Sequence, residues 1–99
     1  MVIELQRLRV NSELRDRWLA ADAEVWTAGL SGEAGFVGKE VWVGVGDQGD
    51  EVLLVIRWRS QADWDGVRKP CLEALDRVFR ERMPDGWEIV ETRSYQVIE

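Results

Sequence analysis

Histidine is absent from this chain of 99 residues, and cysteine occurs once, at position 71. An intrachain disulfide needs two cysteines, and structural zinc sites are built mainly from cysteine and histidine. The sequence therefore excludes both features, and we expect neither a metal nor a cofactor. Cys71 falls within the apolar stripe of a predicted helix, where a thiol is usually buried and inert.

Long apolar runs are also missing, because charged residues recur from Glu4 onwards. A helix that spans a bilayer needs about 20 consecutive apolar residues, so we expect no membrane segment and a cytoplasmic location. Basic residues are outnumbered, with 13 Lys and Arg against 19 Asp and Glu, which gives a formal charge of -6. Such a field repels phosphate backbones and anionic lipids, so we expect neither nucleic acid nor a membrane surface as a partner.

Hydrophobic residues make up 45% of the chain and charged residues 32%, as in an ordinary globular protein. The length suits one hydrophobic core, and no linker or internal repeat is visible, so residues 1–99 are predicted to form a single domain. Apolar periodicity and turn residues predict four strands, at 2–10, 36–45, 51–59 and 87–98. They also predict two helices. The first runs from Asn11 or Ser12 to about Leu30, and the second starts at Ser60, breaks at Gly66 and Pro70, and ends at Met83.

Three details of the strands bear on how they pair and which side chains share a face. The apolar phase of the first strand shifts between Leu5 and Leu8, which is typical of a bulge. The Gly-rich turn at 46–50 joins the second and third strands as an antiparallel hairpin. In the last strand, alternation places Trp87, Ile89 and Tyr95 on the same face.

This order of elements favours an α+β fold of the ferredoxin-like β-α-β-β-α-β type, a four-stranded antiparallel sheet with both helices on one face. Apolar residues nevertheless occupy both faces of the third strand, with Val52 and Leu54 on one side and Leu53 and Val55 on the other. A second copy packed face to face would cover the open side, so we predict a two-fold homodimer through the sheet.

Asp22 is the most unusual position, because it falls within the apolar stripe of the first helix. It either holds a ligand donor or acts as a base, or it forms a structural ion pair with Lys39 or Arg57. Three further charged residues fall within the predicted strands: Lys39, Glu40 and Arg57. Each of these side chains is expected to be paired, to lie at the dimer seam or to line a cavity.

Six tryptophans are an unusually large number of tryptophans for a chain of 99 residues. Most are expected to be core residues, because an indole buries a large area. The functional alternative is an aromatic-walled pocket, with Trp26 and Trp42 as the preferred walls and Trp87 as the least favoured.

Four segments carry a resemblance to a known family: DAEVWT at residues 22–27, GFVGKEVW at 35–42, VIRW at 55–58 and YQV at 95–97. They resemble the dimeric α+β barrel superfamily, which contains the antibiotic biosynthesis monooxygenase-like domains, and within it an uncharacterised family known mainly from cyanobacteria. The resemblance implies the dimeric barrel fold. Relatives that degrade haem use a histidine ligand, which this chain lacks, whereas relatives that oxidise polyphenols without metal or flavin have a pocket that Trp26, Trp42, Trp58 and Tyr95 would serve here.

Three functions remain open at this stage. The first is a dimer that binds a small aromatic molecule between helices and sheet, with a site drawn from Asp22, Trp26, Lys39, Glu40, Trp42, Arg57 and Tyr95. The second is a cofactor-free monooxygenase-like enzyme, which the resemblance allows. The third is a purely structural or regulatory dimer with a filled core and no ligand.

Overall fold

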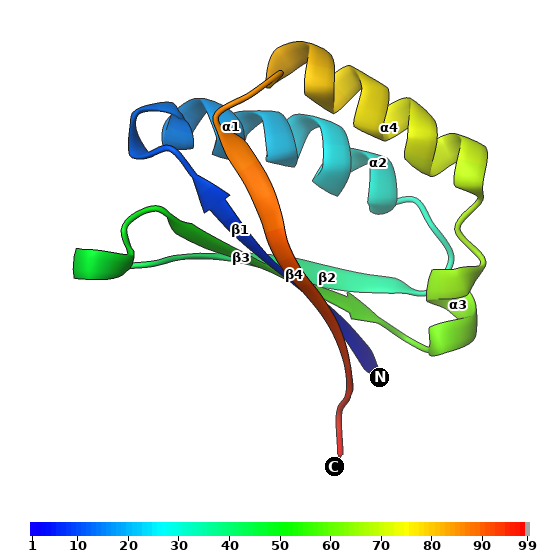
Figure 1. Ribbon diagram of the computed structural model, residues 1–99. Coiled ribbons are helices and arrows are strands. Elements are labelled where there is room, and N and C mark those ends of the chain that lie inside the picture. The colour runs from blue at the N-terminus through cyan, green and yellow to red at the C-terminus, as the bar shows by residue number, and fades with distance from the viewer. Residues whose placement is uncertain (99) are drawn as a thin grey trace.

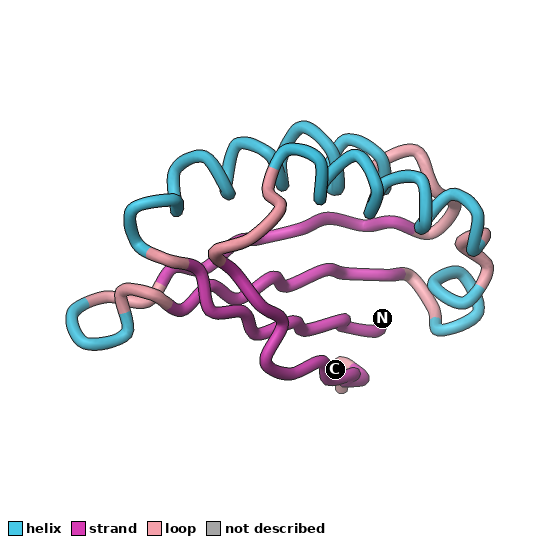
Figure 2. Tube along the Cα trace, turned by 45° about the horizontal axis from the view of Figure 1, so that its top comes forward, coloured by secondary structure: helices cyan, strands magenta, loops and turns pink. Residues whose placement is uncertain are grey.

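The computed structural model describes residues 1–98 and contains one four-stranded antiparallel sheet in the order β2-β3-β1-β4. The strands are β1 (Val2–Val10), β2 (Phe36–Val43), β3 (Glu51–Trp58) and β4 (Trp87–Gln96). The helical region before β2 and the long helix before β4 lie together on one side of the sheet, which we call the inner face, and leave the outer face open (Figure 1, Figure 2). A short helical turn, η3 (Gly46–Gln48), lies apart from them between β2 and β3. The predicted ferredoxin-like β-α-β-β-α-β architecture is confirmed.

The first helical region is continuous along the chain and ends at Leu30, as expected. It consists of η1 (Ser12–Leu14), α1 (Arg15–Ala21), η2 (Asp22–Thr27) and α2 (Ala28–Leu30). The Asn11 side chain caps its start by accepting a hydrogen bond from the backbone N–H of Glu13. The η2 segment is a π-helix, a rare conformation that is frequent at functional sites, and it begins at Asp22.

The second helical region is broken where the sequence predicts a break. Ser60 accepts a hydrogen bond from the backbone N–H of Asp63 and caps α3 (Gln61–Asp65), which ends at Gly66. The chain restarts as α4 (Lys69–Arg82), with Pro70 in its first turn, where a missing N–H costs little.

The expectation of a buried Cys71 is wrong, because this thiol is exposed. The side chains that pack inwards from α4 and its C-terminal cap include Leu75, Phe79 and Met83. Residues spaced by four drift about 40° around a helix at each step, so by Cys71 the predicted stripe has rotated away from the core.

One-residue irregularities in β2 and β4 decide which side chains reach the helices. In β2, Phe36 pairs with Trp58 but Gly38 pairs with Arg57, which leaves Val37 as the extra residue. In β4, the register against β1 shifts between Arg7 and Leu8, and Val90 is the extra residue.

These bulges correct two sequence expectations. The irregularity lies in β4, whereas β1 pairs with β3 without a shift, so the phase change in β1 is not a bulge of that strand. Tyr95 pairs with Ile3 on the outer face, opposite to Trp87 and Ile89, because one extra residue reverses the alternation.

The core lies between the inner face and the helices and falls into two buried clusters. One is centred on Leu8, Val52, Trp18 and Phe79, and the other contains Leu30, Ile56, Trp58 and Val67. The Trp18 and Phe79 rings meet edge to face with centroids 5.5 Å apart. Residues of both clusters also line a cavity between the sheet and the helices.

Candidate functional site

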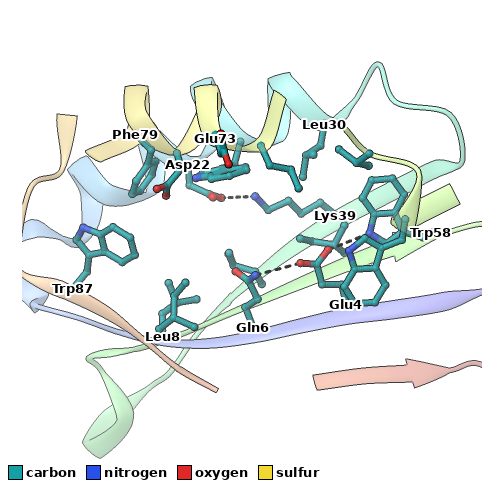
Figure 3. A pocket seen from close by; sticks show the side chains of 18 of the residues that line it. Glu4, Gln6, Leu8, Asp22, Leu30, Lys39, Trp58, Glu73, Phe79 and Trp87 are labelled. Carbon is teal, nitrogen blue, oxygen red and sulfur yellow. Dashed lines mark hydrogen bonds and ion pairs between the residues drawn. The ribbon is translucent and has the colours of Figure 1, made fainter. Parts of the chain in front are cut away.

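A cavity of about 460 Å³ lies between the inner face of the sheet and the helices (Figure 3). Its volume falls within the range usual for small-molecule sites. Five of the six tryptophans line it: Trp18, Trp26, Trp58, Trp64 and Trp87. Apolar walls with a few polar groups between them are typical of a ligand pocket.

Asp22 and Lys39 form a buried ion pair in this cavity. Lys39 Nζ donates to Asp22 Oδ2 at 2.8 Å, and each side chain is only 2% exposed. Asp22 comes from the π-helix η2 and Lys39 from β2, so the pair joins the helix layer to the sheet (Figure 3). The pairing of Asp22 with Lys39 was one of two alternatives open from sequence, and it is the one that the structure contains.

Glu4 is a second acidic group of the cavity, and sequence reasoning missed it. Trp58 Nε1 donates to Glu4 Oε1 and Gln6 Nε2 donates to Glu4 Oε2, both at 3.2 Å. Glu4, Gln6 and Leu8 occupy every second position of the central strand β1, so all three side chains lie on its inner face. The sequence carried an ambiguous signal, because the change of apolar phase between Leu5 and Leu8 puts Glu4 and Gln6 on the same face as Leu8 but also fits a bulge.

Burial raises the pKa of both carboxyl groups. For Glu4 the main cause is desolvation, and the hydrogen bond from Trp58 and the charge of Lys39 act in the opposite direction, lowering its pKa. Desolvation is also the main cause for Asp22, where the charge and the hydrogen bond of Lys39 lower the pKa in part. A folded-state pKa above the unfolded value means that the folded chain holds the proton more tightly. The free energy of unfolding is therefore expected to rise as the pH falls from the pKa of the folded state to the lower pKa of the unfolded state. Above the pKa of the folded state both groups are ionised, and their desolvation costs stability.

Two buried polar atoms of the described residues have no hydrogen-bond partner within the chain, Trp18 Nε1 and Asp22 Oδ1. One is a donor and the other an acceptor, and they lie one helical turn apart, four residues along the helix. Lys39 therefore satisfies only one of the two Asp22 oxygens. Unsatisfied buried groups are rare and call for an explanation, such as a bound water or ligand.

The structure brings together three of the predicted site residues and separates the other four from them. Asp22, Trp26 and Lys39 line the cavity. The remaining four lie on the outer face, as their register shows: Glu40, Trp42, Arg57 and Tyr95.

The outer-face residues form their own polar contacts. Arg57 pairs with Glu40 at 3.3 Å, Trp42 Nε1 donates to Glu40 Oε2 at 3.0 Å, and Arg93 donates to the Tyr95 hydroxyl at 3.3 Å. Trp42 is thus no wall of the cavity, whereas Trp87, the least favoured tryptophan, is one. A ligand-binding role for any of these residues stays a prediction.

Within residues 1–98, no group of three or more acidic or cysteine side chains is placed to hold a metal ion. Over the same residues, no helix has both the length and the apolar character needed to cross a membrane.

The antibiotic biosynthesis monooxygenase family matches residues 1–70 of the chain. HapK from Hahella chejuensis is similar in structure, with a TM-score of 0.76 and 16% identity over 99% of this chain and 93% of that one. SnoaB from Streptomyces nogalater, a cofactor-independent oxygenase, has a TM-score of 0.73 and 12% identity, again over 99% of this chain and 93% of its own. Rv0793 from Mycobacterium tuberculosis has a TM-score of 0.67 and 17% identity over 99% and 95%.

No curated protein matches the chain in sequence. The structural likenesses are all below a fifth in identity, so they establish the shared fold and not a shared activity. The family match covers more than two thirds of the 99 residues, including β1, the first helical region and the β2–β3 hairpin. The chain therefore belongs to the antibiotic biosynthesis monooxygenase family, with the ferredoxin-like fold of that family.

Proposed function

We propose that this protein binds a small aromatic molecule in the cavity between the helices and the sheet. The supporting observation is the cavity itself, about 460 Å³ with five tryptophans and the buried Asp22–Lys39 pair in its lining. Flat aromatic ligands stack on indole rings, and a small number of fixed polar groups orients them. The alternative of a structural dimer with a filled core is less well supported, because a filled core leaves no such space.

The proposal includes a two-fold homodimer that covers the outer face. Trp42 is 49% exposed there and Tyr95 45% exposed, on the face that also carries Leu5 and Leu53. A second copy would bury these residues with the same residues of its partner, because a two-fold interface is self-complementary. The cavity lies on the other side of the sheet, so each subunit would keep its own site.

Replacing Trp26 with leucine is expected to weaken the binding of a flat aromatic ligand about tenfold, which corresponds to about 1.4 kcal/mol, because a stacking surface is lost. Leucine retains an apolar side chain against the core. The measurement is a calorimetric titration with members of a panel of naphthalene and quinone compounds that raise the melting temperature of the parent protein.

Trp42→Leu is the matched control, because it removes an indole from the outer face and should leave affinity within about twofold. Equal losses for both variants would place the ligand outside the cavity. If no compound of the panel shifts the melting temperature, the proposed function fails.

A cofactor-free oxygenase is the second candidate, favoured by the family match and by the fold shared with the oxygenase SnoaB. It predicts oxygen uptake when a polyphenol is added to protein free of flavin and metal, and a lower rate for Trp26→Phe than for Trp42→Phe. Oxygen uptake that is the same in both variants and in buffer alone would contradict this candidate while leaving the binding proposal intact.

A further inference from the structure

The charges around the cavity are unequal in sign. Four carboxyl groups line it, from Glu4, Asp22, Glu73 and Asp76, against two lysines, Lys39 and Lys69. Lys39 is committed to Asp22 at 2.8 Å, and Asp76 accepts from Arg80 at 2.9 Å.

Glu4 is the carboxylate on the cavity floor that lacks a cation of its own. Its two hydrogen bonds come from neutral donors, the Trp58 indole and the Gln6 amide. A carboxylate has about four acceptor positions, so two remain free for a ligand. Glu4 is partly exposed, and because it projects from the inner face of a central strand, that exposure opens into the cavity.

Asp22 shows the same deficit of positive charge. Its Oδ1 atom is buried and has no partner among the described residues, although its side chain is only 2% exposed. One lysine ammonium thus stands between two desolvated carboxyl groups, and the pKa of each is raised by burial despite the charge of Lys39. Buried carboxylates are stable when a cation compensates them, and a cationic ligand would supply that charge.

The tryptophan walls favour the same kind of ligand. Trp26, Trp64 and Trp87 are half-buried, so parts of their indole rings remain accessible. The negative face of an indole attracts a cation, and tryptophan is the strongest of the aromatic side chains in this respect. Trp87 already holds one such contact, with the Arg80 guanidinium carbon Cζ 5.0 Å from its ring centroid.

We propose that the ligand of this cavity is an aromatic cation, a flat molecule with a protonated amine or a positively charged ring nitrogen, held by Glu4 and by the accessible tryptophan rings. The inference rests on the proposed function, since it specifies the charge of the aromatic molecule that the cavity binds. It makes Glu4 the residue that selects ligands by charge, while the apolar walls supply the remaining affinity.

The test uses three naphthalene compounds that differ mainly in charge: 1-naphthylmethylamine, which is protonated at pH 7, the neutral 1-naphthylmethanol, and the anionic 1-naphthoate. Calorimetric titration of the parent protein is expected to show the amine binding at least about tenfold more tightly than the alcohol, and the carboxylate binding most weakly. Glu4→Gln should bring the amine to the affinity of the alcohol while changing the affinity of the alcohol less than about twofold.

Glu81→Gln is the matched control, because it removes one negative charge from an exposed position of α4 that does not line the cavity. It should keep the preference for the amine. An alcohol that binds as tightly as the amine, or a preference that survives Glu4→Gln, would overturn the cation inference and leave the proposed aromatic binding in place. If none of the three compounds binds, the proposed function itself is contradicted, and this inference falls with it.

Discussion

Replacing Asp22 with alanine is expected to lower the free energy of unfolding by about 3–5 kcal/mol, because the change leaves the Lys39 ammonium buried without its partner. The Lys39 side chain is 2% exposed, and its Nζ atom donates to Asp22 at 2.8 Å. Water admitted from the cavity would solvate the ammonium but would not supply the negative charge that the carboxylate provides. Urea denaturation at neutral pH, with all variants at the same protein concentration, measures the loss.

Two further variants separate the cost of an unpaired charge from other effects. The double variant Asp22→Leu with Lys39→Met should recover most of the stability, since an apolar pair often replaces a buried ion pair at little cost. Glu24→Ala is the surface control: Glu24 pairs with Arg82 at 2.6 Å, but the two side chains are 64% and 40% exposed, so the loss should stay within about 1 kcal/mol. A loss of similar size for Asp22→Ala and Glu24→Ala would contradict the buried ion pair.

The order of elements was predictable because it depends on local signals. Ser60 and Asp63 mark a helix start, Pro70 marks a restart, and the Gly-rich turn at 46–50 fixes the β2–β3 hairpin. Each of these residues acts through the backbone within a few positions of itself. Such interactions are contained in the sequence of a short window, and tertiary contacts do not alter them here.

The site was predictable only where one residue broke a pattern strongly. Asp22 stood out as a carboxylate within an apolar helical stripe. The need for a cation left Lys39 and Arg57 as possible partners, and the structure contains the pair with Lys39. Trp42 and Tyr95 were assigned to a pocket wall but lie on the outer face. For Tyr95 the cause is the extra residue Val90, which arises from pairing between β1 and β4, strands at opposite ends of the chain.

Glu4 escaped prediction for a related reason. A change of apolar phase along β1 fits either a bulge or polar residues that face a cavity. Only the packing of the segments on the opposite side of the core distinguishes these two structures. The cavity is enclosed by residues as distant in sequence as Glu4, Asp22 and Glu73. No local pattern shows that these segments leave space between them, because the space depends on the packing of the whole domain.

Replacing Leu53 with aspartate is expected to convert the proposed homodimer to a monomer. Leu53 lies on the outer face of the central strand β3, in a hollow also lined by Leu5 and Tyr95. A two-fold axis would bury the new carboxylate twice, once from each subunit, at several kcal/mol per charge. A total of about 6 kcal/mol corresponds to a roughly 10⁴-fold weaker dimer, which light scattering at micromolar concentration would record as a change of mass.

Val45→Asp is the matched control, because it introduces the same charge at a position that is 82% exposed, just beyond β2, and it should leave the dimer intact. Circular dichroism should show that the Leu53→Asp chain retains its helices and strands, since Leu53 is not part of either buried cluster. A parent protein that is already monomeric at micromolar concentration would refute the dimer. A Leu53→Asp variant that stays folded and dimeric would instead move the interface away from the outer face, which would leave the exposed Trp42 and Tyr95 without a partner surface.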